Sequence, residues 1–151
     1  MNPSFHCLAF EELSLRDLYA LLQLRERVFV VEQNCPYLEL DGLDEHCLHI
    51  VGRQSDKIVA TTRILPPGLK YTEASIGRVV TSQEVRGSGI GRSLMKATLD
   101  AVVEHHGPCP IRLSAQSYLI SFYESFGFVR VSEEYLEDNI PHVDMTRPTT
   151  L

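Results

Sequence analysis

The stretch that decides the fold reads Val85-Arg86-Gly87-Ser88-Gly89-Ile90-Gly91-Arg92, and residues with helical spacing follow it. Glycine lacks a Cβ, so alternating glycines let the backbone turn tightly and direct successive N–H groups at one object. The first turn of a helix also has unpaired N–H groups and a partial positive charge. Together these features predict a phosphate site, although a helix entry that only needs a sharp turn would also use glycine.

The glycine spacing separates this stretch from two common phosphate-binding loops. A Walker loop has four residues between its glycines, followed by Gly-Lys-Ser/Thr. Here three residues separate Gly87 from Gly91, and Arg92 follows. The dinucleotide fingerprint Gly-x-Gly-x-x-Gly comes just after a first strand, whereas the present Gly-x-Gly-x-Gly lies far along the chain. A nucleotide-binding domain is therefore disfavoured.

Composition limits the kinds of partner. The 151 residues suit a single domain, and 44% of them are hydrophobic, as in ordinary globular proteins. With 14 basic and 20 acidic side chains the formal charge is −6, which argues against nucleic acid as a partner. The sequence has no apolar run of membrane-spanning length and no basic-then-apolar N-terminus, so neither a membrane partner nor export is expected.

The cysteines favour neither a metal site nor disulfides. They are widely scattered, at Cys7, Cys35, Cys47 and Cys109. Asp44, His46, Cys47 and His49 are close in sequence, but a strand over 47–53 would point His46 away from Cys47 and His49. No metal is therefore expected, and scattered thiols are typical of a cytoplasmic protein.

Hydrophobic periodicity predicts alternating strands and helices. Ser14 is placed to cap a helix that runs to about Val31 or Glu32, and Gly127 is placed to end a late helix that Ser117 caps. Residues 33–46 are predicted to form a loop, and 133–139 an acidic turn. Strands are expected at 5–10, 48–52, 57–65, 74–81, 111–115, 128–131 and 142–146, and a long helix from Ile90 to about His105.

This element order and several motifs resemble the GCN5-related N-acetyltransferases (GNAT), and more narrowly the ElaA-like subgroup. The motifs are the Arg-Gly-x-Gly-x-Gly loop and the stretches 24–37, 76–80, 122–128 and 138–142. The resemblance implies an α/β (α+β) fold in one domain, residues 1–151. It further implies a mixed, mostly antiparallel sheet of six to seven strands, splayed between strands 4 and 5 and flanked by about four helices.

The same resemblance implies a site for acetyl-CoA. The glycine loop would hold the pyrophosphate, a bulge near the end of the fourth strand would bind the thioester carbonyl, and the end of the fifth strand would border the pantetheine arm. The implied cofactor residues are Val79, Val80, Thr81, Arg86, Gly87, Ser88, Gly89, Ile90, Gly91, Arg92, Ala115 and Gln116.

Tyr123 is the candidate general acid, because a departing thiolate needs a proton. Phe122 and Phe126 share a helix face, whereas Tyr123 is rotated away from it. An aromatic residue that only packs beside these two phenylalanines is the alternative.

The acidic segment 32–45 is either a solvated loop or the rim of an amine-binding pocket. Glu32, Asp41, Asp44 and His49 are the candidate acceptor-binding residues. The general base stays open among Glu32, Glu39, Asp41, Asp44, His49 and Glu73. Arg25 and Arg78 lie in matching motifs and are expected to pair with these carboxylates, which would make them structural.

The resemblance thus implies an acetyl-CoA-dependent N-acetyltransferase. The acceptor would be a primary amine of a small molecule, a protein or a peptide that attacks the thioester directly. A catalytically silent CoA-binding sensor or interaction module is the alternative. The sequence leaves the oligomeric state open between a monomer and a homodimer.

Overall fold

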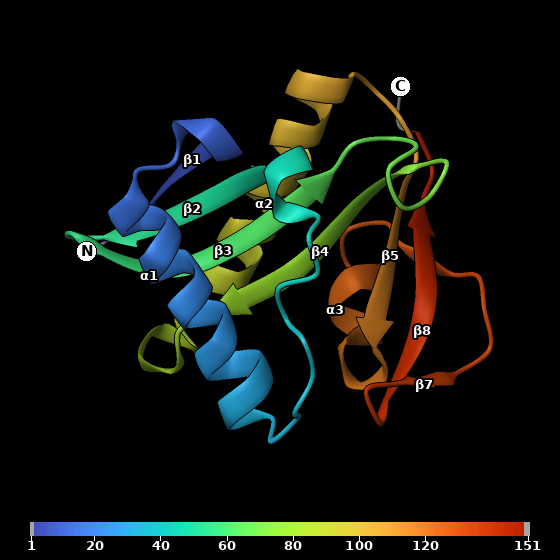
Figure 1. Ribbon diagram of the computed structural model, residues 1–151. Helices are drawn as coiled ribbons and strands as arrows, with labels where there is room; N and C mark the ends of the chain where they lie inside the picture. The colour runs from blue at the N-terminus through green and yellow to red at the C-terminus, as the bar shows by residue number, and fades with distance from the viewer. Residues whose placement is uncertain (1, 150–151) are drawn as a thin grey trace.

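A computed structural model describes residues 2–149, and they form one mixed eight-stranded sheet (Figure 1). The strands follow the order β1-β2-β3-β4-β5-β8-β6, and β7 pairs with β8 outside this path. The strands are β1 (Ser4–Ala9), β2 (Leu48–Gln54), β3 (Lys57–Leu65), β4 (Ala74–Thr81), β5 (Ile111–Gln116), β6 (Val129–Arg130), β7 (Tyr135–Glu137) and β8 (Ile140–Arg147).

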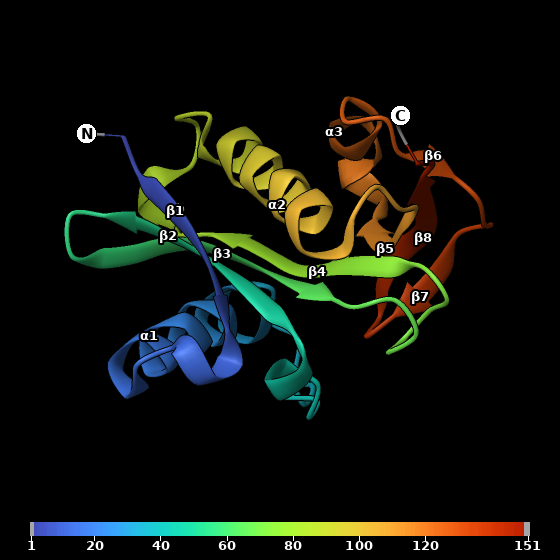
Figure 2. The same cartoon turned by 90° about the horizontal axis from the view of Figure 1, so that it is seen from above.

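Helices cover both faces of the sheet. Figure 2 shows α1 on one face and α2 with α3 on the other. The helices are α1 (Leu15–Glu26), α2 (Ile90–His106) and α3 (Ile120–Glu124), with a π-helix η2 (Arg27–Glu32) and the 3-10 turns η1 (Phe10–Glu12), η3 (Asp44–His46), η4 (Gln83–Val85) and η5 (Ser117–Leu119). The larger core lies under α2 and α3, and a smaller one lies under α1.

Local sequence signals explain most helix boundaries. The Ser14 hydroxyl accepts the N–H of Asp17 at 3.1 Å, which confirms the predicted N-cap. The first helix reaches Glu32 as predicted, but its last turn is the π-helix η2. Gly107 ends α2 with φ +73° as predicted, but Gly127, with φ +90°, does not end the late helix, because α3 ends at Glu124 with Ser125 as its C-cap. Ser117 does not cap the late helix; it is the first residue of η5, and its hydroxyl binds Glu134.

The sheet is splayed between β4 and β5, as the resemblance implied. These two parallel strands pair only at Ala74 with Ile111 and at Ser75 with Arg112, and beyond those pairs they diverge (Figure 1). Because hydrogen bonds stop there, the sheet opens between β4 and β5 instead of continuing as one surface.

The strand and helix counts differ from the expectation. Residues 2–149 contain eight strands instead of six to seven, because β7 occupies part of the predicted acidic turn. It forms a hairpin with β8 through Asp138 and Asn139, both with positive φ (50° and 65°), as a tight hairpin turn requires. Aspartate and glutamate are depleted in strands, so the acidic composition of this segment predicted a turn instead of a strand. The described residues contain three α-helices instead of about four, and none of their helices is long and apolar enough to cross a membrane.

Candidate functional site

A cavity of about 740 Å³ lies where β4 and β5 diverge. It is lined by residues from both halves of the sheet, from the end of the first helix, from α3 and from the β7–β8 hairpin. Val79, Val80 and Thr81 line one side, and Gln116 and Tyr123 line the other, so the cavity contains most of the residues expected around a thioester.

A β-bulge lies on the β4 side of this cavity. Thr61 pairs with Val80 and Arg63 pairs with Gly77, so Arg78 and Val79 together lie opposite the single residue Thr62. Arg78 has φ +50°, a conformation that costs a non-glycine residue about 1–3 kcal/mol. Such a bulge leaves a residue out of the ladder, and its N–H becomes available to another acceptor.

The glycine loop leaves open space before α2. Gly87 and Gly89 have φ values of +83° and +81°, and a Cβ at either position would meet no atom within 4 Å. Gly89 is the N-cap of α2, so the unpaired N–H groups of this helix begin here. Gly91 lies in α2, where a Cβ would be at an ordinary contact distance, 4.0 Å, from the Phe122 ring.

Two arginines flank this loop and have different neighbours. Arg86 lines the cavity, forms an ion pair with Glu32 and donates to the Thr81 carbonyl at 3.0 Å. Arg92 instead donates to the Ser125 hydroxyl at 3.0 Å and lies over the Phe126 ring, outside the cavity lining. Arg86 is therefore the one of the two that can contact a ligand in the cavity directly.

Tyr123 lines the cavity although it is only 5% exposed. Its ring meets Phe122 and Phe128 edge-on, with centroids 5.3 and 5.9 Å away. Within residues 2–149 its hydroxyl makes no hydrogen bond. Burial raises the pKa of Tyr123 well above its usual range, so the phenol keeps its proton at neutral pH. The side chain both packs in the core and presents a proton donor to the cavity.

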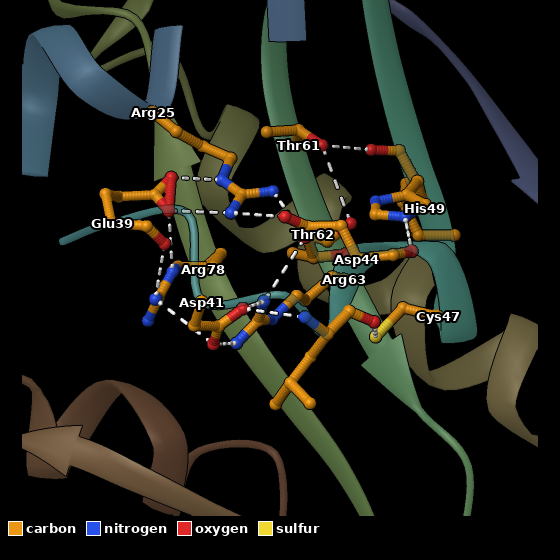
Figure 3. Close-up of polar contacts among 12 residues, drawn as sticks. Arg25, Glu39, Asp41, Asp44, Cys47, His49, Thr61, Thr62, Arg63 and Arg78 are labelled. Atoms are coloured by element: carbon orange, nitrogen blue, oxygen red, sulfur yellow. Dashed lines mark hydrogen bonds and ion pairs between the residues drawn. The ribbon is translucent and has the colours of Figure 1, made fainter. Parts of the chain in front are cut away.

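The acidic segment is bound to arginines in a buried network (Figure 3). Arg25 donates to Glu39 at 2.7 Å and to Asp44 at 2.8 Å, which confirms the expected pairing of this arginine. Arg78 donates to the Glu39 carboxylate at 3.1 Å and to the Glu39 carbonyl at 2.9 Å, which confirms the expected pairing of Arg78 as well. The network contains three carboxylates, Glu39, Asp41 and Asp44, and three arginines, Arg25, Arg63 and Arg78.

Arg63 is the partner that the sequence did not indicate. It is 2% exposed and donates to Asp41 at 2.8 Å and to Asp44 at 3.2 Å. Burial alone would raise the pKa of Asp41, but the hydrogen bonds and charge of Arg63 hold it well below its usual range. The pKa of Asp44 is lowered against burial in the same way, chiefly by Arg25. Both carboxylates are therefore poor proton acceptors at neutral pH.

The structure separates the acceptor candidates. Glu32 and Asp41 line the cavity, whereas Asp44 and His49 do not. His49 is fully buried, and its Nε2 lies 2.8 Å from the Asp44 carbonyl oxygen (Figure 3). Burial lowers the pKa of His49, so it is neutral. Glu73 is 3.9 Å from Arg112 and is also outside the cavity lining.

Several cavity-lining residues were not proposed from the sequence, and two of them carry titratable side chains close to each other. Glu137 and His142 both come from the β7–β8 hairpin. His142 belongs to the stretch 138–142, which was singled out as a motif but given no chemical role. The sequence therefore showed the motif, but the position of His142 in the cavity depends on the pairing of β7 with β8.

Comparisons with known proteins agree with this geometry. Residues 22–148 match the family model described as Acetyltransferase (GNAT) domain. The chain is similar to Protein ElaA of Escherichia coli, with 49% identity over 138 residues and 90% of each chain covered. The crystal structure of E. coli ElaA superimposes with a TM-score of 0.91 at 46% identity, covering 96% of this chain and 99% of that one. An acyl-CoA N-acyltransferase from Pseudomonas aeruginosa gives a TM-score of 0.92 at 44% identity, with the same coverage.

Proposed function

Because this chain belongs to the GNAT acetyltransferase family, we propose that it transfers an acetyl group from acetyl-CoA to a primary amine by direct attack on the thioester. The family assignment makes the protein an acyltransferase that uses acyl-CoA. We propose acetyl-CoA as the acyl donor, and we propose the roles of the individual site residues. One observation carries it: a protonated tyrosine and a strand bulge line the same cavity.

The residues around the cavity fit CoA. Open space before Gly87 and Gly89 leaves room for a pyrophosphate against the N–H groups of 87–91, which include those of Ser88 and Ile90, and Arg86 supplies positive charge. Arg92 adds to the charge at this end of α2. Gln116 lines the cavity and, with the backbone of Ala115, would border the pantetheine arm.

When bound, acetyl-CoA supplies an activated acyl group, and this chain supplies the polar groups around it. N–H groups from Val79 to Thr81 would polarise the thioester carbonyl, and a fixed donor of this kind contributes about 3–4 kcal/mol. The Tyr123 hydroxyl would give its proton to the leaving sulfur.

The charge near the cavity supports a cationic acceptor. Glu32 and Asp41 are neutralised by arginines. Glu137 and Asp138 also line the cavity, and neither pairs with an arginine or lysine of residues 2–149. An ammonium group on a small molecule or on a protein or peptide would be attracted to these two carboxylates.

We also propose that residues 1–151 act as one domain in the cytoplasm. All strands of residues 2–149 belong to a single sheet, which supports one domain. The free thiols of Cys35 and Cys47 are buried and support a reducing compartment.

The test is to incubate the protein with acetyl-CoA and a panel of amines while free thiol is measured. We expect thiol release that depends on both the amine and acetyl-CoA. Binding of CoA without turnover across a broad panel, with no effect of Tyr123→Phe, would instead support the silent sensor or interaction module. Binding of ATP but not CoA would overturn both.

A further inference from the structure

His142 on β8 is a cavity residue that the proposed chemistry does not yet use. Its Nδ1 lies 2.6 Å from the Ile140 carbonyl oxygen. A carbonyl oxygen can only accept, so Nδ1 is the nitrogen that carries the proton. In the neutral ring Nε2 therefore has a free lone pair, as a proton acceptor requires.

Neighbouring side chains hold the imidazole in this orientation. The Tyr135 ring stacks on it with centroids 6.2 Å apart and an angle of 23° between the planes. Tyr135 is itself held by the Asp144 carboxylate at 2.6 Å and by the Ser114 hydroxyl. Nε2 lies 3.5 Å from the Glu137 carboxylate, and His142 is only 7% exposed. A carboxylate at this distance would stabilise the imidazolium that forms when Nε2 takes a proton.

The alternation of side chains along β8 places His142 on the side of the sheet that faces α1. Val143 and Met145 alternate with His142 and are fully buried in the core under α2 and α3. His142 is paired with Gln116 across β5 and β8, and both line the cavity. The hairpin tip reaches across the opening, where the Cys35 thiol donates to the Asp138 carbonyl at 3.3 Å. His142 therefore lines the cavity on the side of the sheet where Gln116 donates to Gln33 at the end of the first helix, at 3.4 Å.

We propose that His142 is the general base that removes a proton from the acceptor ammonium, an inference that rests on the proposed acetyl transfer. Nε2 takes one proton from nitrogen, and the nitrogen lone pair forms the C–N bond as the C–S bond breaks. The leaving sulfur takes a proton from the Tyr123 hydroxyl, and the second proton lost from nitrogen restores that hydroxyl. The products are the amide, the thiol and one proton on His142.

The other candidate bases are engaged elsewhere. Glu32, Asp41 and Glu39 are paired with arginines. Asp44, His49 and Glu73 lie outside the cavity lining. The titratable groups near His142 include Glu137 and Tyr135 on β7, Asp138 in the hairpin turn, Tyr118 on η5 and Asp144 on β8. Asp144 is bound by Arg112 of β5, and Lys70 and Tyr71 from the loop before β4 also line the cavity. Of these only Glu137 is within ion-pair distance of Nε2.

The test compares the pH dependence of kcat/KM in wild type and His142→Gln. We expect His142→Gln to lower kcat/KM about 100-fold or more and to flatten its acid limb. The dissociation constant of acetyl-CoA should stay unchanged, because the base does not hold the cofactor. His6→Gln, an exposed histidine on β1, is the matched control and should behave as wild type.

Two further variants keep the test independent of folding defects in His142→Gln. In His142→Ala, added imidazole should restore part of the lost rate. In Glu137→Gln, the acid limb should move to lower pH, because the anion that favours the imidazolium is gone. An unchanged acid limb in a folded His142→Gln or in Glu137→Gln, or no rescue by imidazole, overturns the assignment of His142. Wild-type protein that transfers nothing to any amine overturns the proposed function itself.

Discussion

Tyr123 packs in the core and also lines the cavity, where we propose that its hydroxyl has a chemical role. Its ring packs against Phe122 and Phe128, while its hydroxyl has no hydrogen bond within residues 2–149. Burial raises its pKa, so the phenol is protonated at neutral pH. A donor of this kind can protonate a thiolate as the sulfur departs.

Tyr123→Phe should lower kcat about 100-fold while the dissociation constant of acetyl-CoA stays unchanged. The substitution keeps the ring packing and removes only the proton donor. Steady-state kinetics and calorimetric titration of the cofactor measure the two quantities. Tyr19→Phe, at an exposed site on α1, is the control. Equal kcat in Tyr123→Phe and wild type would leave Tyr123 with a packing role alone.

Arg86 forms an ion pair with Glu32, so the proposed binding of a pyrophosphate to Arg86 would compete with this pair. Both side chains are about a third exposed, and such pairs are worth about 0–1 kcal/mol. Glu32→Gln should therefore tighten CoA binding by up to about fivefold, and Arg86→Met should weaken it.

Calorimetric titration of CoA measures both effects. Glu84→Gln is the matched control, because Glu84 and Lys57 form an exposed ion pair outside the cavity lining. Weaker binding in Glu32→Gln would contradict competition for Arg86 and would indicate that Glu32 itself contributes to the site.

At the scale of elements, the bulge of β4 depends on the loop that follows the first helix. The strained residue Arg78 binds Glu39 through both its carboxylate and its carbonyl. Glu39 is bound in turn by Arg25 of α1. The strand end that would polarise a thioester is thus tied to a helix on one face of the sheet.

Replacing Arg78 by glycine and by alanine separates backbone strain from side-chain contacts. Both variants lose the contacts with Glu39, but only glycine adopts a positive φ without cost. We expect Arg78→Gly to be more stable than Arg78→Ala by about 1 kcal/mol and to keep more of the kcat. Urea unfolding and steady-state kinetics provide the comparison. If alanine is at least as stable as glycine, the positive φ at this position carries no strain.

At the scale of the whole molecule, the network of Figure 3 makes stability depend on pH. Arg63 depresses the pKa of Asp41 in the folded protein. An unfolded aspartate takes up its proton near pH 3.9, so below about this pH the unfolded chain binds more protons than the folded one. The stabilisation from Asp41 is therefore present above that pH and is lost as the pH falls further.

Asp41→Asn should be less stable than wild type at neutral pH, and this deficit should shrink as the pH falls below about 4. Thermal unfolding followed between pH 2.5 and 7 measures it. Asp56→Asn, in the exposed turn between β2 and β3, is the control. A deficit that stays constant down to the lowest pH would show that Asp41 does not titrate differently in the two states.

The sequence by itself determined the features that depend on neighbouring residues. Ser14 caps α1, Gly87 and Gly89 take positive φ, and the apolar spacing of α2 matches its buried face, since each signal acts within a few residues. The order of strands and helices followed from these local signals and, with the motifs, indicated the family. The roles of Tyr123 and the glycine loop stay predictions.

Only the tertiary structure decided which distant residues meet. Arg63 joins the acidic segment, β7 forms against β8, and His142 enters the cavity beside Gln116. None of these contacts can be inferred from composition or periodicity, because each one depends on which distant residues the folded sheet brings together. Local sequence signals specify which helices and strands form. The register of the strands and the burial of their charges specify which side chains can react.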